Sequence, residues 1–496
     1  MRTLTTIETR SRCSTLGATF TALGGLLLFL AVLAGCAVGP DYKRPELNAP
    51  AAFRPAATGT NDLSATNSLA DLGWWQVMND PQLQNYITEA LTNSWDIKIA
   101  AARVLQAEAS ARVTRSQFMP TIGVGGDWST TRTSENGPST IPPGVNPVRD
   151  YGSVYGAMAG YEVDLWGRIR RANEAARAQL LATQDAQQTV RQTLVAQVAG
   201  AYLSLLELDY EMEIAQRTYS IRTNSLQLTE ARQEGGVASK QDVYQAQILV
   251  FTAEASIANT HRLIEQQENE LSILLGRNPG SPLRGEGFLH QKLEVTVPPG
   301  LPSDLIERRP DIRAAEQQLV AANADVGQAK AAFFPKVTLT GFYGFQSVAL
   351  SDLFKSGSQT WQFGPAVSFP LFTGGALRGN LKLARARFDE AVALYQKTVQ
   401  NSFREVSDSL IAYQRTREFR ARQEDLTQAN RNAADMASVR YDGGVTSYLE
   451  VLYNEQELFA AEFNLAQARL SELLSVVALY RSLGGGWQTE DAMAQK

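Results

Sequence analysis

The sequence predicts a mixed α and β membrane protein, in which each chain supplies four strands to a transmembrane β-barrel that continues into long helices. Three observations support this fold class: an internal two-fold repeat, helices with a coiled-coil seam, and short strands in which large apolar residues alternate with small or polar ones. Four strands cannot close a barrel, and an open sheet edge in lipid leaves backbone groups unpaired. The chain must therefore supply part of a barrel, and three chains, as a homotrimer, would bring the sheet to twelve strands.

The first residues have the layout of a secretion signal. Arg2, Arg10 and Arg12 precede an apolar stretch that ends at Cys36, as in a signal peptide. The letters "LAGC" before Ala37 resemble a lipobox, at which bacterial lipoproteins are cleaved and the cysteine is acylated. We expect a covalent lipid on Cys36 and no other cofactor. The alternative is an uncleaved membrane anchor, because about 20 apolar residues nearly span a bilayer.

The rest of the chain contains a long-range repeat. The segment "DIKIAAARVLQAEASARVTRSQFMP" at 96–120 aligns without a gap with "DIRAAEQQLVAANADVGQAKAAFFP" at 311–335, and "EGGVASKQDVYQAQ" at 234–247 is echoed by "DGGVTSYLEVLYNE" at 442–455. Solenoid repeats have much shorter periods, so the pattern indicates a duplication. The expected divisions are a lipoprotein signal peptide (1–35), a lipid-anchored extended segment (36–80), a first repeat (81–276), a linker (277–303), a second repeat (304–484) and a C-terminal tail (485–496).

Each repeat is predicted to run helix, strand, strand, long helix, turn, helix. A helix of about 65 residues would extend roughly 100 Å at 1.5 Å per residue, which is far longer than a globular domain needs. The predicted helices are 81–117, 169–233, 240–275, 304–332, 376–441 and 447–483, and the predicted strands are 120–130, 151–164, 336–346 and 360–371.

Two of the long helices carry apolar residues at alternating steps of four and three. That spacing is a coiled-coil seam, and the alternative is an ordinary helical bundle. The seam residues are Leu194, Val198, Ala201, Leu205, Leu208, Met212, Ala215 and Tyr219 in one helix, and Phe459, Phe463, Ala466, Leu470, Leu473, Val477 and Tyr480 in the other.

The predicted strands alternate in the way that a sheet between lipid and water requires. Trp361, Phe363 and Val367 are separated by small or polar residues, and Tyr151, Tyr155 and Tyr161 have the same parity. Pro120 and Pro335 stand where helix changes to strand, because proline disfavours helix in the residue before it and has no N–H to offer a ladder. We expect this helix-to-strand transition to mark the membrane surface.

Five segments, which together extend over the mature chain, carry a resemblance to a known family. They are "GCAVGPDYKRP", "WWQVMNDPQL", "YEVDLWGRIRRANEAARAQ", "ERRPDIRAAEQQLVAANADVGQAKAAFFP" and "FPLFTGGALRGNL". The chain resembles the outer-membrane efflux lipoproteins, which are TolC-like channels of resistance-nodulation-division pumps. The resemblance implies a passive channel for small molecules such as drugs, with a barrel in the outer-membrane lipid and a helical barrel in the periplasm. Its implied partners are a periplasmic adaptor and an inner-membrane pump.

The two helix turns are the candidate functional site. Their paired glycines permit a tight reversal between antiparallel helices. The resemblance implies that these turns contact the adaptor and that the adjoining residues form a periplasmic gate. Tyr453 departs from the family pattern, because related channels often have aspartate at this position, and its ring would narrow the pore sterically. The adaptor-contact residues are Gly235, Gly236, Val237, Gly443, Gly444 and Val445, and the gate residues are Asp242, Glu450, Tyr441 and Tyr453.

Simpler roles are available for several of these charges. Asp242 and Glu450 lie in the first turns of their helices, where acids favourably oppose the helix dipole. Arg168, Arg170 and Arg171 of "GRIRR" are expected to form an interfacial or packing cluster and not a selectivity ring.

Composition argues against nucleic-acid binding and catalysis. The net charge is −5 with no long basic run, and the chain has only two histidines, no phosphate-binding loop and no cysteine after Cys36. We expect no enzyme activity, no metal site and no nucleic-acid partner. The alternatives to an efflux duct are a lipid-anchored periplasmic coiled-coil scaffold, or a duct for metal efflux or protein secretion.

Overall fold

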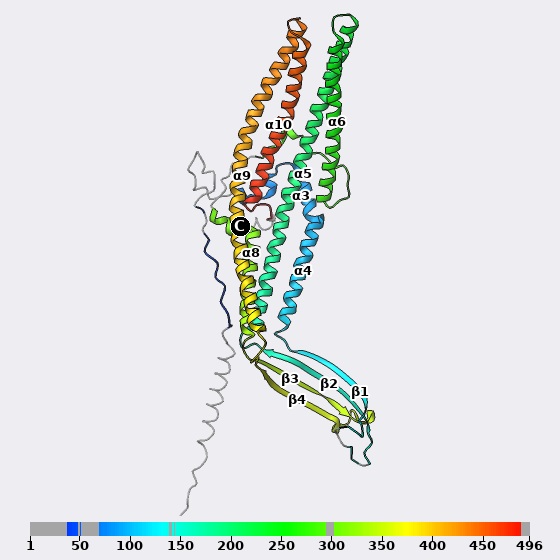
Figure 1. Ribbon diagram of the computed structural model, residues 1–496, viewed down its shortest axis with the longest axis vertical. Coiled ribbons are helices and arrows are strands. Elements are labelled where there is room, and N and C mark those ends of the chain that lie inside the picture. The colour runs from blue at the N-terminus through cyan, green and yellow to red at the C-terminus, as the bar shows by residue number, and fades with distance from the viewer. Residues whose placement is uncertain are drawn as a thin grey trace, which may run out of the picture. The chain divides into compact units, whose positions relative to one another are not determined.

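Two successive sets of helices and strands make up the described chain (Figure 1). The computed structural model describes residues 37–47, 50, 69–137, 141–142, 144–293 and 302–487. The helices are α2 (Trp74–Val77), α3 (Pro81–Asn93), α4 (Trp95–Ser116), α5 (Arg168–Glu234), α6 (Lys240–Leu274), α7 (Pro302–Arg308), α8 (Pro310–Ala331), α9 (Ala376–Asp442) and α10 (Tyr448–Ser482), and the strands are β1 (Thr121–Arg132), β2 (Val148–Val163), β3 (Lys336–Ser347) and β4 (Gln359–Ser368).

The chain divides into two units, to which both sequence repeats contribute. We call the first the sheet unit; it comprises residues 1–45, 106–180 and 317–392. We call the second the helical unit; it comprises residues 46–105, 181–316 and 393–496.

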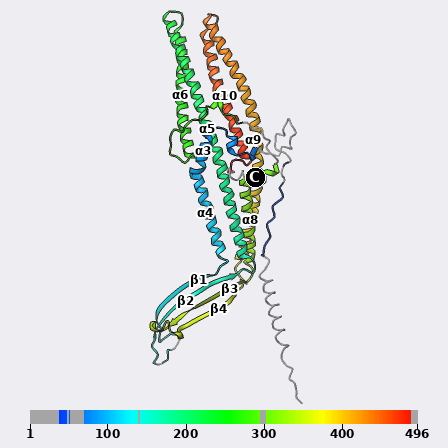
Figure 2. The same cartoon turned by 180° about the vertical axis from the view of Figure 1, so that it is seen from behind.

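The sheet unit is built on four antiparallel strands in the order β1-β2-β3-β4, which lie side by side in both ribbon views (Figures 1 and 2). Residues opposite each other in such a ladder share a face. One row across the sheet contains Val124, Gly156, Tyr343 and Trp361, and the side chains of all three residues other than the glycine are large, apolar and exposed. A row on the other face contains Asp127, Ser153 and Gln346. The sheet therefore has an exposed apolar face and a polar face.

A β-bulge in β2 changes one sequence expectation. The register between β2 and β3 shifts between Met158 and Tyr161, and Gly160 adopts a φ of 52° that favours glycine. Tyr161 consequently pairs with Leu339, whereas Tyr155 pairs with Gly344. The prediction that Tyr151, Tyr155 and Tyr161 share one face is wrong, because the inserted residue reverses the parity.

The helical unit is held by the predicted seams. In α5 and α10 most of the seam residues are buried and the others are half-buried. Burying such side chains contributes about 1.5–3 kcal/mol for each large aliphatic or aromatic group. The buried seam residues are Leu194, Val198, Ala201, Leu205, Met212 and Ala215 in α5, and Phe459, Ala466, Leu473, Val477 and Tyr480 in α10.

Two helices predicted as continuous are each interrupted once. The first breaks at Ser94, whose extended backbone (ψ 137°) ends α3 before α4 begins. The second breaks at Arg309, because the residue before Pro310 is disfavoured in a helix.

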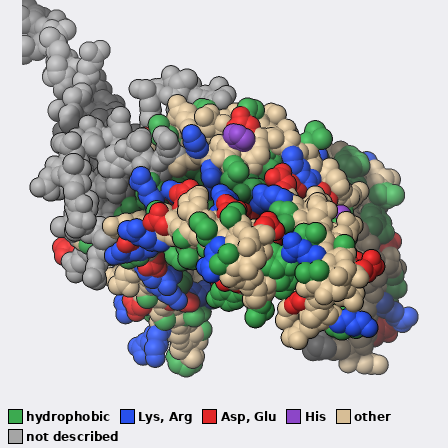
Figure 3. Space-filling model, turned by 90° about the horizontal axis from the view of Figure 1, so that it is seen from above, with side chains coloured by type: hydrophobic (Ala, Val, Ile, Leu, Met, Phe, Trp, Pro, Cys, Tyr) green, Lys and Arg blue, Asp and Glu red, His purple; other side chains and the backbone are tan. Residues whose placement is uncertain are grey.

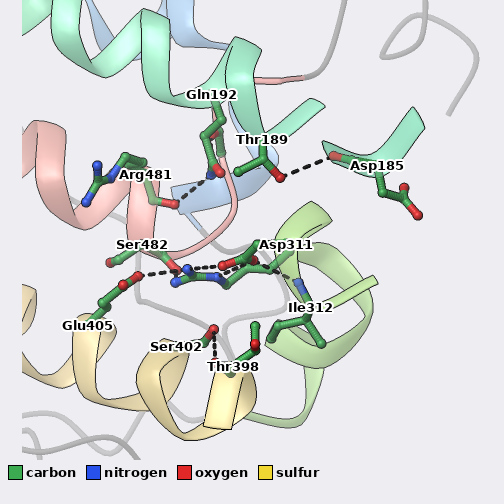
Figure 4. Close-up of polar contacts among 12 residues, drawn as sticks. Asp185, Thr189, Gln192, Asp311, Ile312, Thr398, Ser402, Glu405, Arg481 and Ser482 are labelled. Atoms are coloured by element: carbon green, nitrogen blue, oxygen red, sulfur yellow. Dashed lines mark hydrogen bonds and ion pairs between the residues drawn. The ribbon is translucent and has the colours of Figure 1, made fainter. Parts of the chain in front are cut away.

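Arg309, whose side chain is buried, fills the second break and gathers a polar cluster around it (Figure 4). Its guanidinium donates to both carboxylate oxygens of Asp311 at 3.0 and 2.6 Å, to Glu405 at 2.7 Å and to the carbonyl of Ser482 at 3.0 Å. The cluster joins the start of α8 to α9 and to the last turn of α10, which gives the "ERRPDIR" motif a structural role.

Two predictions concern residues outside the described part of the chain. Cys36 and the signal peptide lie there, as do residues 48–49 and 51–68 of the predicted extended segment 36–80. Among the described residues, no helix combines the length and the hydropathy that crossing a membrane requires.

Candidate functional site: the paired hairpin tips

The first tip connects α5 to α6 through the sequence "GGVAS". Gly235 donates to the carbonyl of Ala231, and Val237 donates to the carbonyl of Arg232 at 2.8 Å, so the last carbonyls of α5 are satisfied. Gly236 has a φ of 75°, which a residue with a Cβ rarely adopts. The glycine pair therefore permits the reversal, as the sequence predicts.

The second tip repeats this backbone in "GGVTS". Gly443 donates to Val439, Val445 donates to Arg440 at 2.9 Å, and Gly444 has a φ of 72°. The two hairpins, α5 with α6 and α9 with α10, end at the same end of the helical unit in both ribbon views (Figures 1 and 2).

Asp242 closes a capping box at the start of α6. Its Oδ2 accepts from the backbone N–H of Ser239 at 2.8 Å, and the Ser239 hydroxyl accepts from the N–H of Asp242 at 3.2 Å. The carboxylate therefore has a stabilising role in its own hairpin. Its assignment to a gate stays a prediction.

Glu450 occupies the equivalent helix turn with different partners. It accepts from the hydroxyl of Thr446 and lies 3.4 Å from the guanidinium of Arg440. The side chain of the capping residue Ser447 makes no capping hydrogen bond. Glu450 therefore connects α10 to the end of α9, and its assignment to a gate also stays a prediction.

Tyr441 lies in a group of contacts that join the two hairpins. The Arg232 guanidinium lies 4.7 Å from the centre of its ring, and the ring of Tyr448 lies 5.2 Å away. Arg232 also approaches Asp442 at 3.9 Å, and the Ser225 and Tyr448 hydroxyl oxygens are 2.5 Å apart. Burial raises the pKa of Tyr448, so this hydroxyl stays protonated.

Farther from the tips, two buried polar contacts were not identified from the sequence. Arg222, which is almost fully buried, donates to the Leu249 carbonyl and to Gln456, both at 3.0 Å. Glu462 accepts a hydrogen bond from Arg217 of α5, and it accepts a second one, at 2.8 Å, from Arg431 of α9. On a long helix these residues resemble ordinary surface charges, because sequence alone does not give the register between helices.

The ends of the hairpins present apolar side chains to solvent. Val237 and Val445 are 83% and 72% exposed, and on α10 Leu449 and Tyr453 are also exposed. The view from above shows hydrophobic side chains interspersed with basic and acidic ones (Figure 3). Such a surface is suited to contact with another protein.

The helix-to-strand transition of the sheet unit contains the two predicted prolines. Pro120 directly precedes β1 and Pro335 directly precedes β3. Trp166 stacks on Phe334 with ring centres 4.7 Å apart, and its indole N–H donates to the Pro335 carbonyl at 2.8 Å. The arginines of "GRIRR" form packing contacts, as expected: Arg168 with Glu162, Arg170 with Asp164, and Arg171 with Asp41 and Glu174.

The described residues include no candidate metal centre. No three His, Cys, Asp or Glu side chains among the described residues are placed to hold a metal ion. The geometry at the tips can hold two hairpins together and present a docking surface.

Comparison with known proteins agrees with this architecture. The family described as outer membrane efflux protein matches residues 86–277 and 301–485. The toluene efflux pump outer membrane protein TtgC of Pseudomonas putida is 37% identical over 465 residues, which cover 94% of this chain and 96% of the relative. Outer membrane protein OprJ of Pseudomonas aeruginosa is 34% identical over 464 residues, covering 93% and 95%. The open-state outer membrane channel MtrE of Neisseria gonorrhoeae superimposes with a TM-score of 0.82 at 30% identity, covering 91% of this chain and 99% of MtrE.

Proposed function

The chain belongs to the outer membrane efflux protein family, and from this premise we propose that three copies form the passive exit duct of a tripartite pump. The protein itself is an outer-membrane efflux protein. The proposal concerns its assembly, its passive role, its partners and its cargo.

The observation that carries the proposal is the amphipathic sheet with two edges. β1 and β4 each pair with one neighbour only among the described residues. Unpaired backbone groups cost several kcal/mol each in lipid, and the exposed apolar face is suited to acyl chains. Joining β1 of one copy to β4 of the next removes every edge, and three copies give twelve strands.

Exposed apolar side chains on the helical unit support packing between copies. On α6, Tyr244, Ile248 and Phe251 are exposed at steps of four and three, and on α9 Met436 and Val439 are exposed. These are seam positions without a partner in the described chain. We propose that α6 of one copy packs against α9 of the next, so that the helices form a closed tube.

The hairpin tips would bind the partners. Val237 and Val445 offer apolar side chains at the ends of the helices, where a periplasmic adaptor could dock end to end. Relatives are named as outer membrane proteins of toluene and antibiotic efflux pumps. We propose small organic molecules as cargo, delivered by an inner-membrane pump, with no catalysis by this chain.

Covalent lipid on Cys36 completes the proposal. The lipobox-like "LAGC" supports it. Substituting Cys36→Ser should abolish palmitate labelling, whereas persistent labelling would place the lipid elsewhere.

Channel recording tests the proposed duct directly. Full-length protein added to a planar lipid bilayer should give discrete conductance steps. A protein that stays dispersed without detergent and carries no current would indicate the periplasmic scaffold instead.

A further inference from the structure

The start of the mature chain is bound to the sheet unit by a series of specific contacts. The backbone N–H of Val38 donates to the carbonyl of Trp166 at 3.0 Å. Ala37 lies so close to Gly167 that a Cβ on that glycine would be 2.8 Å from the Ala37 Cα. The chain therefore runs directly beside the loop between β2 and α5.

The next residue is held by a contact between two glycine backbones. A Cβ on Gly39 would lie 2.5 Å from the Cα of Gly327 in α8, and Gly39 has a φ of 120°. Both the space and the backbone conformation therefore require glycine at this position. A Cβ on Gly327 would in turn approach the side chain of Arg171 to 3.0 Å.

Two buried side chains hold the following residues. Asn323, which is 4% exposed, donates to the carbonyl of Pro40 at 3.0 Å. Arg171, which is 5% exposed, binds Asp41 at 2.7 Å while the Asp41 side chain itself is exposed. Arg171 also pairs with Glu174 of α5 at 2.8 Å, so Asp41 adds a second charged contact that ties this segment to the start of α5.

A cleft of about 360 Å³ adjoins the attachment point. Leu165, Trp166, Phe334 and Pro370 supply much of its apolar lining, and Trp166 and Phe334 are each about a third exposed. Arg168 and Lys336 lie at the same cleft and pair with Glu162 at 2.7 and 3.0 Å. Such a cleft is suited to a lipid whose acyl chain lies against the apolar side chains, while its polar ester linkage lies near Arg168 and Lys336.

We propose that residues 37–41 form an anchor clamp, which directs an acyl chain of Cys36 into the cleft beside Trp166 and Phe334. This proposal rests on the proposed lipidation of Cys36. Cys36 is joined to Ala37 by one peptide bond, which limits their Cα atoms to about 3.8 Å, and Ala37 already lies against the residue that follows Trp166. The clamp would fix the lipid anchor at the level where the apolar strands begin.

Photo-crosslinking tests the clamp on the full-length protein. Cells are grown with a diazirine fatty acid, the membranes are irradiated, and digested protein is analysed by mass spectrometry. The expected product is a crosslink between the acylated Cys36 peptide and a peptide that contains Trp166 or Phe334. Adducts of those peptides with phospholipid alone would mean that bulk lipid fills the cleft, and would overturn the proposal.

Two variants and one control sharpen this test. Gly39→Ala should lower the intramolecular crosslink about tenfold, because a side chain there cannot keep the contact with Gly327. Asn323→Ala should lower the yield of the crosslink by a smaller factor. It replaces Gly39→Ala in the test if that variant does not accumulate in cells. Gly379→Ala, at a helical position with open space around it, should leave the crosslink unchanged.

The outcomes separate the clamp from the lipidation on which it rests. Wild-type protein with lipid on Cys36 but crosslinks elsewhere, or equal crosslinking in wild type and Gly39→Ala, would refute the clamp alone. Wild-type protein without lipid on Cys36 would refute both.

Discussion

The hydroxyl oxygens of Ser225 and Tyr448 lie 2.5 Å apart and join α5 to α10 near the hairpin tips. Tyr448 is buried, and Tyr441 packs on its ring. The two hairpins of one chain are therefore linked by this hydrogen bond and by the contact of the Arg232 guanidinium of α5 with the Tyr441 ring. Any opening at the tips has to separate these residues or move them together.

Tyr448→Phe should loosen this link. The substitution removes one hydrogen bond and leaves the Ser225 hydroxyl without it, at a cost of about 1 kcal/mol. We expect a larger or noisier single-channel conductance in planar bilayers. Tyr343→Phe, which alters an exposed hydroxyl of β3, is the control, and identical traces for the two variants would argue that the link does not restrain the tips.

Neutralising the acids at the tips separates a gate role from a capping role. If Asp242 and Glu450 lie at the aperture, the double variant Asp242→Asn with Glu450→Gln should reduce the preference for cations over anions. The reversal potential in a salt gradient measures this preference. Asp242→Glu with Glu450→Asp keeps both charges and should behave as wild type. An unchanged reversal potential in the neutral variant would leave Asp242 with its capping box and Glu450 with its contacts to Thr446 and Arg440 as their only roles.

A buried acid pair in α5 should make stability depend on pH. Burial, together with the charge and hydrogen bond of Glu211, raises the pKa of Glu207 from 4.5 to about 9. Between these values the folded chain holds a proton that the unfolded chain releases, so the free energy of unfolding falls as pH rises. Denaturant titrations across this window should show that fall.

Glu207→Gln removes the titrating group and should flatten the dependence. The variant should also be more resistant to denaturant than wild type near pH 9. Glu213→Gln changes an exposed residue of the same helix and should keep the wild-type slope. If the free energy of unfolding fell equally steeply with pH in wild type and in Glu207→Gln, the raised pKa of Glu207 would be contradicted.

Arg309→Ala should destabilise the helical unit strongly. It leaves Asp311 and Glu405, whose side chains are 29% and 37% exposed, without the buried cation that they share. Losing these charge-assisted hydrogen bonds should cost about 1.5–3 kcal/mol. Arg308→Ala is a matched control, because Arg308 pairs with Asp71 where both side chains are about a third exposed and should cost about 1 kcal/mol or less. Equal unfolding midpoints for the two variants would show that the cluster contributes little.

The sequence predicted those features that depend on local signals. The hairpin ends were predicted within one or two residues, because the glycines of "GGV" favour the backbone conformation that ends a helix. The starts of β1 and β3 were predicted because Pro120 and Pro335 disfavour helix in the residues before them. Alternation of large and small residues was enough to predict four strands.

Features that depend on tertiary register were missed. The bulge at Gly160 was not visible because one inserted residue leaves the composition of a strand unchanged. Arg222, Glu207 and Glu462 look like surface charges until the packing of the helices is known. The contact of Gly39 with Gly327 joins residues far apart in the chain, and only the structure brings them together.

The most direct test of the central claim is the mass of the detergent-solubilised mature protein, corrected for bound detergent. We predict three chains per particle, because three four-stranded sheets can close one barrel and remove the edges at β1 and β4. A stable monomer without detergent would contradict the account, because its sheet edges and apolar face would then not lie in lipid.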